Sequence, residues 1–323
     1  MNATENQRLL VKVARLYYEQ DLTQNEIGER LRLSRQKVQR LLRQAQEVGV
    51  VQINIRPVMG TYPELEKALE QRFGMSETVI VETSAFENQP TVAREVGAGA
   101  AQYLNRIIQP TDRIVISWGG SLLGMVNAFR SSTRGISYPG VSVIQGLGGL
   151  GDPNNEVHAA DLTRRLAWIL GGQAVLLHTP AVAGTRGARD AFYADPFVRQ
   201  TLEMARSAHL AIMGIGAPRQ DSILMQQGKI VSWPELQALQ RQGAVGDINL
   251  RYFDAAGQPI SSDLDDRTIG LSLTELREIP QVIGVAGGAA KIQAITGALH
   301  GRLVDVLVTD HRTAALILET QTP

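Results

Sequence analysis

The stretch 22–43, LTQNEIGERLRLSRQKVQRLLR, constrains the fold of this chain more than any other part of its sequence. Thr23, followed three residues later by Glu26, has the spacing of a capping box, so a helix is expected to begin at Gln24. Ser34 is expected to cap a second helix, whose apolar residues recur at helical spacing until Gly49 ends it. Only a short turn separates the two helices. The sequence therefore predicts a pair of short helices that meet at a sharp angle.

The outward face of the second helix is polar and basic. Its apolar residues define a buried side, so the other positions are expected to face away from the first helix. Polar side chains at the start of a helix that follows a short turn are typical of a helix-turn-helix, whose second helix enters the DNA major groove. A solvated basic surface is the alternative interpretation. The residues expected to contact DNA are Thr23, Gln24, Ser34, Arg35, Gln36, Lys37, Gln39, Arg40 and Arg43.

The charge distribution along the chain favours the DNA-binding interpretation. The 323 residues are formally neutral, but residues 1–60 contain ten basic and six acidic side chains, a net charge of +4 that leaves −4 for the remainder. Basic side chains neutralise DNA phosphates, and this supplies most sequence-independent affinity. Gln36 and Gln39 are suited to adenine, whereas Arg35 and Arg40 are suited to phosphates or guanine.

Several classes of protein are disfavoured by composition. The chain has no cysteine, which excludes disulfides and thiolate sites and suits a reducing cytoplasm. Its first residues lack the basic and apolar regions of a secretory signal, and its apolar stretches are too interrupted to span a membrane. The histidines show no spacing for a metal site, and neither a metal nor a cofactor is expected.

Three further segments precede the remainder of the chain. Apolar residues between Leu9 and Tyr17 predict a first helix, which ends near Gln20. The alternating segment 50–56 predicts a strand, either a wing beside the second helix-turn-helix helix or a link to the rest of the chain. A capping box at Thr61 and Glu64 predicts a connecting helix, used as a lever or dimer contact. The expected domains are 1–57, a connecting segment 58–74, and 75–323.

From residue 78 onward, short β-branched runs alternate with helical periodicity. This alternation predicts a doubly wound α/β domain with a mostly parallel sheet, in which ligands bind at the carboxyl ends of the strands. The expected strands are 78–81, 113–117, 141–145, 174–177, 210–215, 282–286 and 304–309, and the expected helices include 91–108, 121–129, 156–170, 196–208 and 291–299.

Glycines follow most of these strands, as in ISWGGSL, QGLGGLG, GIGA and GVAGGAAK. Several glycine turns at one edge of a sheet would expose backbone N–H groups at helix starts, which favours an anionic ligand. The nucleotide-binding motif GxxxxGK[ST] is absent. Lys291 is the candidate partner for the anion, with a surface lysine as the alternative. Asp247 is a candidate acceptor for ligand hydroxyls, with a turn aspartate that bonds its own backbone as the alternative.

The segment ARLYYEQDLTQNEIGERLRLSRQKVQRLLRQAQEVGVVQINI, followed in order by ISWGGSL, QGLGGLG, GAVGDINLRYFD, GVAGGAAKIQAI and LVTDHRTAALIL, resembles the SorC family of sugar-binding bacterial transcriptional regulators. The resemblance covers nearly the whole chain. It implies a winged helix-turn-helix, an effector domain similar to sugar-phosphate isomerases and deaminases, operator binding as a homodimer or homotetramer, and a carbohydrate effector that is often phosphorylated. The effector residues that it implies are Trp118, Gly119, Gly120, Ser121, Gly148, Gly149, Asp247 and Lys291.

Three functions remain to be distinguished. The first is an effector-controlled regulator of transcription, which we expect. The second is a sugar-phosphate isomerase or deaminase with a DNA-binding segment, in which Asp247, Asp310 and His311 would act as acid and base. Asp310, however, is expected to cap a helix. The third is a DNA-binding protein with no effector. No function is assigned to the acidic segment 263–266, which is expected to be a solvated turn.

Overall fold

The computed structural model describes residues 3–53, 58, 60–132, 137–149, 159–220 and 231–320. Contacts between residues divide the chain into two compact units, Met1–Val58 and Met59–Pro323. We call them the N-terminal unit and the C-terminal unit and describe each by itself.

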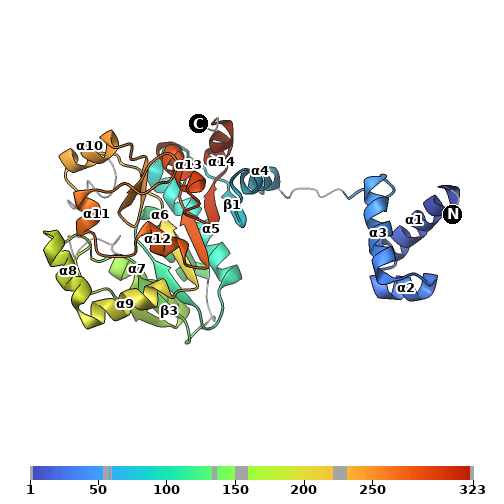
Figure 1. Cartoon of the computed structure of the whole chain (residues 1–323), viewed down its shortest axis with the longest axis horizontal. Helices are drawn as coiled ribbons and strands as arrows, with labels where there is room; N and C mark the ends of the chain where they lie inside the picture. The colour runs from blue at the N-terminus through green and yellow to red at the C-terminus, as the bar shows by residue number, and fades with distance from the viewer. Residues whose placement is uncertain are drawn as a thin grey trace. The chain divides into compact units, whose positions relative to one another are not determined.

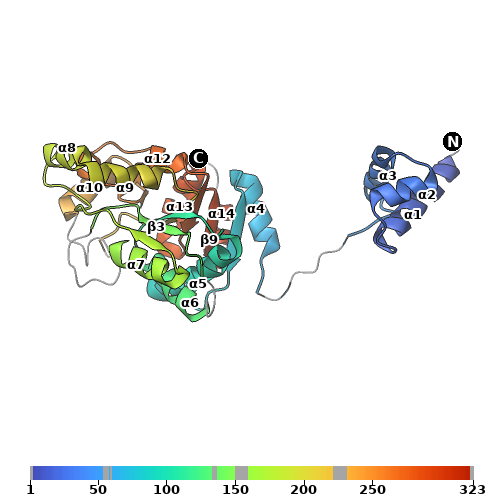
Figure 2. The same ribbon diagram turned by 90° about the horizontal axis from the view of Figure 1, so that it is seen from below.

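The N-terminal unit consists of three helices, α1 (Ala3–Tyr18), α2 (Gln24–Leu31) and α3 (Arg35–Glu47) (Figures 1 and 2). Both expected helix caps are confirmed. The Thr23 hydroxyl accepts the Glu26 N–H, and the Glu26 carboxylate accepts the Thr23 N–H at 2.7 Å. The Ser34 hydroxyl accepts the Lys37 N–H at 3.2 Å. The core between the helices is made by Leu10, Val13, Ala14, Leu16, Ile27, Val38, Leu41, Leu42 and Ala45.

The turn between α2 and α3 explains the glycine at position 28. Arg32 adopts a left-handed conformation with φ 54°, and the Leu33 N–H returns to the Gly28 carbonyl at 2.8 Å. A Cβ atom on Gly28 would lie 2.7 Å from the Leu33 carbonyl oxygen, closer than real Cβ contacts. The glycine therefore makes room for the backbone of the turn between the two helices.

The expected strand at 50–56 is only partly within the described residues. Val50–Ile53 form no strand, and residues 54–57 lie outside the described residues. The Val51 N–H donates to the Ala45 carbonyl at 3.0 Å, and its side chain packs against the three-helix core. A wing at this position stays a prediction.

The C-terminal unit is built on a seven-stranded sheet with the order β1-β9-β8-β5-β2-β3-β4, in which every neighbouring pair is parallel. Each of the seven expected strands is present, with shifts of one or two residues at its ends. Their bounds are β1 Glu77–Val81, β2 Arg113–Ile116, β3 Ser142–Gln145, β4 Gln173–Val175, β5 Leu210–Gly214, β8 Gln281–Val285 and β9 Val306–Asp310.

Helices cover both faces of this sheet, so the doubly wound α/β fold is confirmed. Helices α5 (Gln89–Ile107), α6 (Gly120–Ser132) and α7 (Ala159–Leu170) pack on one face. Helices α4 (Pro63–Phe73), α9 (Pro196–Arg206), α13 (Ile292–His300) and α14 (His311–Glu319) pack on the other (Figure 2). Successive strand residues alternate between the two cores: Leu307 lies in one, and Val306 and Val308 in the other.

Helix α4 belongs to the C-terminal unit. The carboxylates of Glu70 and Glu66 accept the N–H groups of Thr78 and Ile80 in β1, at 2.8 and 3.1 Å. The capping box expected at Thr61 is wrong: the N-cap is Tyr62, which makes no side-chain capping bond, and Pro63 occupies the first turn, where a missing N–H costs nothing.

The C-terminal unit contains further elements. They are α8 (Arg186–Ala194), α10 (Trp233–Arg241), the antiparallel hairpin β6 (Gly246–Ile248) and β7 (Arg251–Phe253), α11 (Asp263–Arg267), α12 (Leu273–Arg277) and the 3₁₀ turn η2 (Ala289–Lys291). The acidic segment is therefore helix α11 rather than a solvated turn. Its Asp265 accepts from the buried Arg251 guanidinium at 2.7 Å.

A loop and a helix end meet backbone to backbone in this unit. Gly257, with φ 72°, follows β7, and Gly301 directly follows α13. A Cβ atom on Gly301 would lie 2.6 Å from the Gly257 Cα atom. Neither position has space for a side chain.

Candidate functional site

The outward face of α3 carries the polar residues that the sequence assigns to DNA. Val38, Leu41, Leu42 and Ala45 are buried on the other side of this helix. Lys37 is half-buried. The other side chains on the outward face are exposed, and these are Arg35, Gln36, Gln39, Arg40 and Arg43. Arg43 forms an exposed ion pair with Glu47 at 3.2 Å. Arg35 and Arg40 form no ion pair among the described residues, so their charges remain available to a polyanion.

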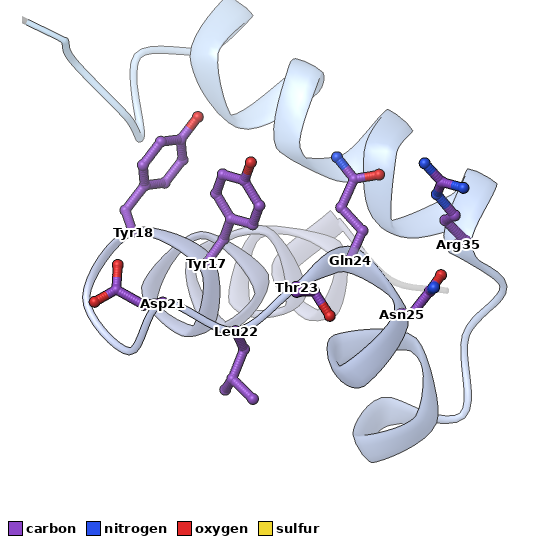
Figure 3. Close-up of a pocket in the computed structure, with 8 residues that line it drawn as sticks. All are labelled: Tyr17, Tyr18, Asp21, Leu22, Thr23, Gln24, Asn25 and Arg35. Carbon is purple, nitrogen blue, oxygen red and sulfur yellow. The ribbon is translucent and has the colours of Figure 1, made fainter.

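The beginnings of α2 and α3 open onto one surface hollow (Figure 3). The hollow is lined by the end of α1, by residues 21–25 and by Arg35. The side chains of Tyr17, Gln24 and Arg35 point to the same side of it. Asn25, which the sequence did not single out, is exposed beside them. The sequence feature that points to Asn25 is its place in the first turn of α2, where free backbone N–H groups favour the binding of a phosphate.

The C-terminal unit has a topological switch point between β2 and β5. The chain proceeds from β2 to β3 and β4 on one side, and from β5 to β8 and β9 on the other. Ligands of such sheets bind in the crevice at the carboxyl ends of the two central strands. The predicted loop Trp118–Gly119–Gly120–Ser121 begins two residues after the end of β2, and α6 begins at Gly120. Its first-turn N–H groups therefore lie at this edge. The Ser121 hydroxyl is buried and has no hydrogen-bond partner among the residues with a described structure.

The hairpin β6–β7 places Asp247 at the end of β5. Gly216, just beyond β5, and Asp247 exchange backbone hydrogen bonds of 2.8 and 3.1 Å. The Asp247 side chain lies so close to Gly216 that a Cβ there would overlap its carboxylate. Asp247 is 4% exposed. Its Oδ2 accepts the Leu250 N–H at 3.3 Å, whereas its Oδ1 is buried and accepts no hydrogen bond from the residues that the structure describes.

Lys291 follows β8, on the other side of β5 from β2, and its charge acts on Asp247. Burial raises the pKa of Asp247 to about 6, although the Leu250 N–H and the Lys291 charge oppose the shift. Burial also lowers the pKa of Lys291 to about 8, against the charge of Asp247. The half-buried Lys291 is thus electrostatically linked to Asp247 and is not simply a solvated surface lysine.

The glycines after β3 have a different role from the one expected. The Gly148 N–H donates to the Ile269 carbonyl at 3.0 Å, and the Gly149 N–H donates to the Thr179 carbonyl at 2.7 Å. A Cβ at Gly148 would overlap the backbone of Pro180. Both amides are therefore occupied, and the expectation that they present free N–H groups to an anion is wrong. Close backbone packing explains Gly148.

Asp310 is the cap of α14, as expected. Its Oδ1 accepts the N–H groups of Arg312 and Thr313, and its Oδ2 accepts the Gly288 N–H and the Thr313 hydroxyl. Both carboxylate oxygens are thus engaged, which disfavours Asp310 as a general base. The adjacent His311 stacks on Tyr62. Within the described residues, no group of three or more metal-ligating side chains occurs, and no helix is long and apolar enough to cross a membrane.

Comparisons with known proteins agree with both units. The family described as "Putative sugar-binding domain" matches residues 59–319, and the family "Sigma-70, region 4" matches residues 4–47. The deoxyribonucleoside regulator of Bacillus subtilis is 31% identical over 97% of this chain and 98% of its own length. The transcriptional regulator LsrR of Klebsiella pneumoniae is 31% identical over 98% of this chain and 94% of its own length.

A solved structure shows the same architecture. The crystal structure of the full-length sorbitol operon regulator SorC from Klebsiella pneumoniae is 30% identical and covers 96% of this chain and 98% of its own, with a TM-score of 0.73. The relationship extends through the helix-turn-helix and the α/β unit together. The chain therefore belongs to the SorC family of sugar-binding transcriptional regulators.

Proposed function

We propose that this regulator binds operator DNA through the outward face of α3 and the start of α2, as a homodimer or homotetramer, and that a phosphorylated carbohydrate at the β2–β5 switch point controls its operator affinity. A helix-turn-helix reads two-half-site operators as an oligomer. Operator binding would place the protein in the cytoplasm. The names of its relatives, a sorbitol operon regulator and a deoxyribonucleoside regulator, support a carbohydrate effector.

The observation that carries this proposal is the buried Oδ1 of Asp247, which accepts no hydrogen bond within the described part of the chain and is influenced by the charge of Lys291. A buried acceptor without a donor is rare in folded proteins and calls for a partner. A sugar hydroxyl is such a donor. Lys291 and the first N–H groups of α6 would bind the phosphate: both carry positive charge, and they follow β8 and β2, the two strands that flank β5. One effector molecule would thereby satisfy both groups.

The charge state of the pair at neutral pH suits this division of roles. With pKa values of about 6 and about 8, both side chains are ionised near pH 7, although burial disfavours each charge. A phosphate dianion beside Lys291 would raise its pKa and stabilise the ammonium form. A hydroxyl that donates to Asp247 would stabilise the carboxylate.

A continuous set of contacts joins this site to the start of α4. Gly288, three residues before Lys291, donates its N–H to the carboxylate of Asp310 at 2.8 Å. The next residue, His311, stacks on Tyr62. Tyr62 is the N-cap of the first helix that follows the N-terminal unit in sequence. An effector that shifts the Lys291 loop would therefore act on the segment that leads to the DNA-binding helices.

The enzyme alternative is less well supported. Because both oxygens of Asp310 accept hydrogen bonds from the protein, Asp247 and His311 are left as acid–base candidates. The relatives are named as regulators. Turnover of ribose 5-phosphate or glucosamine 6-phosphate by the pure protein would contradict the proposal and favour an enzyme.

The test is a thermal-shift screen against sugar phosphates and their unphosphorylated parents, followed by operator titrations with each hit. We expect one phosphorylated sugar to raise the unfolding temperature and to change operator affinity. Lys291→Ala should abolish both effects. Lys67→Ala, which removes an exposed lysine on α4, is the matched control and should preserve them. A response only to free sugars or polyols would contradict a phosphorylated effector.

A further inference from the structure

The tip of the β6–β7 hairpin has a backbone conformation that its residues seldom adopt. Two-residue hairpin turns with positive φ at both positions normally use glycine or asparagine. Here the tip is Asn249 and Leu250, with φ values of 60° and 62°. A leucine in the left-handed region is uncommon, and it persists only where the surrounding structure determines the conformation.

Burial of the leucine side chain holds one half of the tip. Leu250 is fully buried, and it packs with Leu147 after β3 and Ala181, with Trp118 of the predicted effector loop against them. The hairpin tip is therefore inserted between the carboxyl ends of β2 and β3. The indole that the family resemblance assigns to the effector rests on the same cluster.

Hydrogen bonds of the asparagine side chain hold the other half. Asn249 is 2% exposed. Its Oδ1 accepts the Ser117 hydroxyl at 3.0 Å, directly after β2. Its Nδ2 donates to the Gly146 carbonyl at 2.9 Å, directly after β3, and to the Leu271 carbonyl at 3.1 Å. One amide thus joins the hairpin to two strand ends and to the segment before α12.

The same turn determines how the Asp247 carboxylate is oriented. Asp247 is two residues before Asn249, and its Oδ2 accepts the N–H of Leu250 within the turn. This bond leaves Oδ1 as the oxygen that has no partner in the described ranges. The orientation of the free oxygen therefore depends on the conformation of the tip, and the tip depends on the three hydrogen bonds of Asn249.

We propose that Asn249 is a positioning residue for effector recognition: by anchoring the hairpin tip to the ends of β2 and β3, it directs Asp247 Oδ1 toward the hydroxyls of the sugar. Asn249 itself does not contact the effector. The effector role of Asp247 rests on the function proposed above, whereas the anchoring of Asp247 by Asn249 can be tested without any ligand.

Asn249→Gly is the decisive variant, because glycine retains the positive φ while it removes all three side-chain hydrogen bonds. Calorimetric titration should show that the variant binds the sugar phosphate at least about 10-fold more weakly, since a factor of ten corresponds to the loss of one good hydrogen bond. Its affinity for inorganic phosphate should change less than about twofold, because Lys291 is unaffected. Unchanged affinity for the sugar phosphate, or an equal loss for both ligands, would overturn the proposal.

Two further variants separate positioning from simple loss of stability. Ser117→Ala removes one of the three hydrogen bonds and should give a smaller loss of the same selective kind, even if Asn249→Gly does not fold. Ser232→Ala removes the cap of α10, outside this cluster. It should lower the unfolding temperature and leave the sugar-phosphate affinity unchanged. If the loss of sugar-phosphate affinity were proportional to the loss of unfolding temperature in all three variants, a positioning role would be contradicted.

A ligand-free measurement completes the test. In protein without effector, the Asp247 carboxyl should titrate with a pKa of about 6, measured by ¹³C NMR of labelled aspartate. In Asn249→Gly the hairpin loosens and water reaches the carboxylate, so the pKa should fall toward 3.8. An unchanged pKa would overturn the positioning role of Asn249. Failure of the wild-type protein to bind any sugar phosphate would instead count against the proposed function, and this titration would still decide how Asp247 is held.

Discussion

The ring of Tyr62 stacks on the ring of His311, with the centroids 5.1 Å apart and the planes inclined by 12°. Tyr62 precedes α4, and His311 begins α14, directly after the Asp310 that binds the Gly288 amide. A second histidine, His300, lies against Phe73 at the other end of α4, with the centroids 5.5 Å apart. Both ends of α4 are thus held by aromatic contacts, and at the first end Asp310, the residue before His311, accepts the Gly288 N–H from the loop of Lys291.

We expect His311→Ala to reduce the effect of the effector on operator affinity without weakening effector binding. Coupling between two sites typically changes affinity by about 5- to 150-fold, and loss of the Tyr62 contact should bring this ratio toward one. Operator titrations with and without effector give the ratio, and calorimetry gives the effector affinity. His300→Ala is the matched control and should retain the coupling. An unchanged ratio in His311→Ala would show that this contact does not transmit the signal.

The stability of the protein should depend on pH through Asp247. Its folded pKa of about 6 is higher than the ordinary value of 3.8, so the folded state binds the proton more tightly. The contribution of Asp247 to the free energy of unfolding is therefore fully present below about pH 4 and is lost as the pH rises through about 6. In Asp247→Asn this loss is absent. The free energy of unfolding of the variant relative to wild type should increase by about 1–3 kcal/mol from pH 4 to 6.5, measured by urea unfolding. Parallel pH profiles would contradict the burial of this carboxylate.

The pKa of Lys291 is lowered, so its contribution to stability depends on pH in the opposite direction from that of Asp247. Its folded pKa of about 8 lies below the ordinary value of 10.5, and stability is therefore lost as the pH falls through about 8. The window from pH 6 to 8 is where both groups carry unfavourable charges in the absence of effector. Effector binding should raise the unfolding temperature more in this window than at pH 5, where protonated Asp247 no longer needs a donor.

Two helical glycines should respond oppositely to replacement by alanine. Alanine favours a helix by about 1 kcal/mol over glycine. At Gly187, in α8, an added Cβ meets nothing closer than the Thr185 hydroxyl at 4.0 Å, so Gly187→Ala should stabilise the protein by up to about 1 kcal/mol. At Gly28 the added Cβ meets the Leu33 carbonyl oxygen at 2.7 Å. Gly28→Ala should therefore destabilise the N-terminal unit by about 1–3 kcal/mol, measured by thermal unfolding. Equal effects of the two variants would show that the α2–α3 turn adapts freely.

The salt dependence of DNA affinity should distinguish the residues of the outward face of α3 that contact phosphates from those that contact bases. Each phosphate contact adds about 0.9 to the slope of log affinity against log salt concentration. Arg40→Ala should weaken binding to all sequences and reduce this slope by about one if Arg40 binds phosphate. Gln36→Ala should leave the slope unchanged and reduce discrimination between operator variants. Arg43→Ala, whose charge is already offset by Glu47, should have the smallest effect. If none of the three variants changed binding, the assigned face would be wrong.

Sequence patterns predicted the framework of this fold because its strands are buried on both faces. Such strands are continuous β-branched runs, as in β2 and β9, and glycines or helix caps mark their ends. Both caps of the helix-turn-helix and the cap formed by Asp310 were also predictable, because each depends on residues only two or three positions apart. Local patterns therefore predicted local structure.

Features that depend on distant contacts were not predictable. The β6–β7 turn contains no glycine, and its conformation is held by packing with Trp118 and Leu147 and by the hydrogen bonds of the Asn249 side chain. Asp265 in the acidic segment is paired with Arg251, 14 residues earlier. The amides of Gly148 and Gly149 are occupied by carbonyls of residues 269 and 179, which no nearby pattern reveals. For the same reason, sequence indicated Asp247 and Lys291 as site residues but not Asn249.

The contact between Gly257 and Gly301 has a consequence for how this family can diverge. The two backbones touch, and each residue occupies the space that a side chain on the other would need. A methyl group cannot be accommodated at one position by a smaller residue at the other, because glycine is already the smallest. We therefore expect relatives to retain both glycines together, or to replace both where an insertion separates the loop after β7 from the end of α13. An aligned set of homologous sequences would show this joint variation.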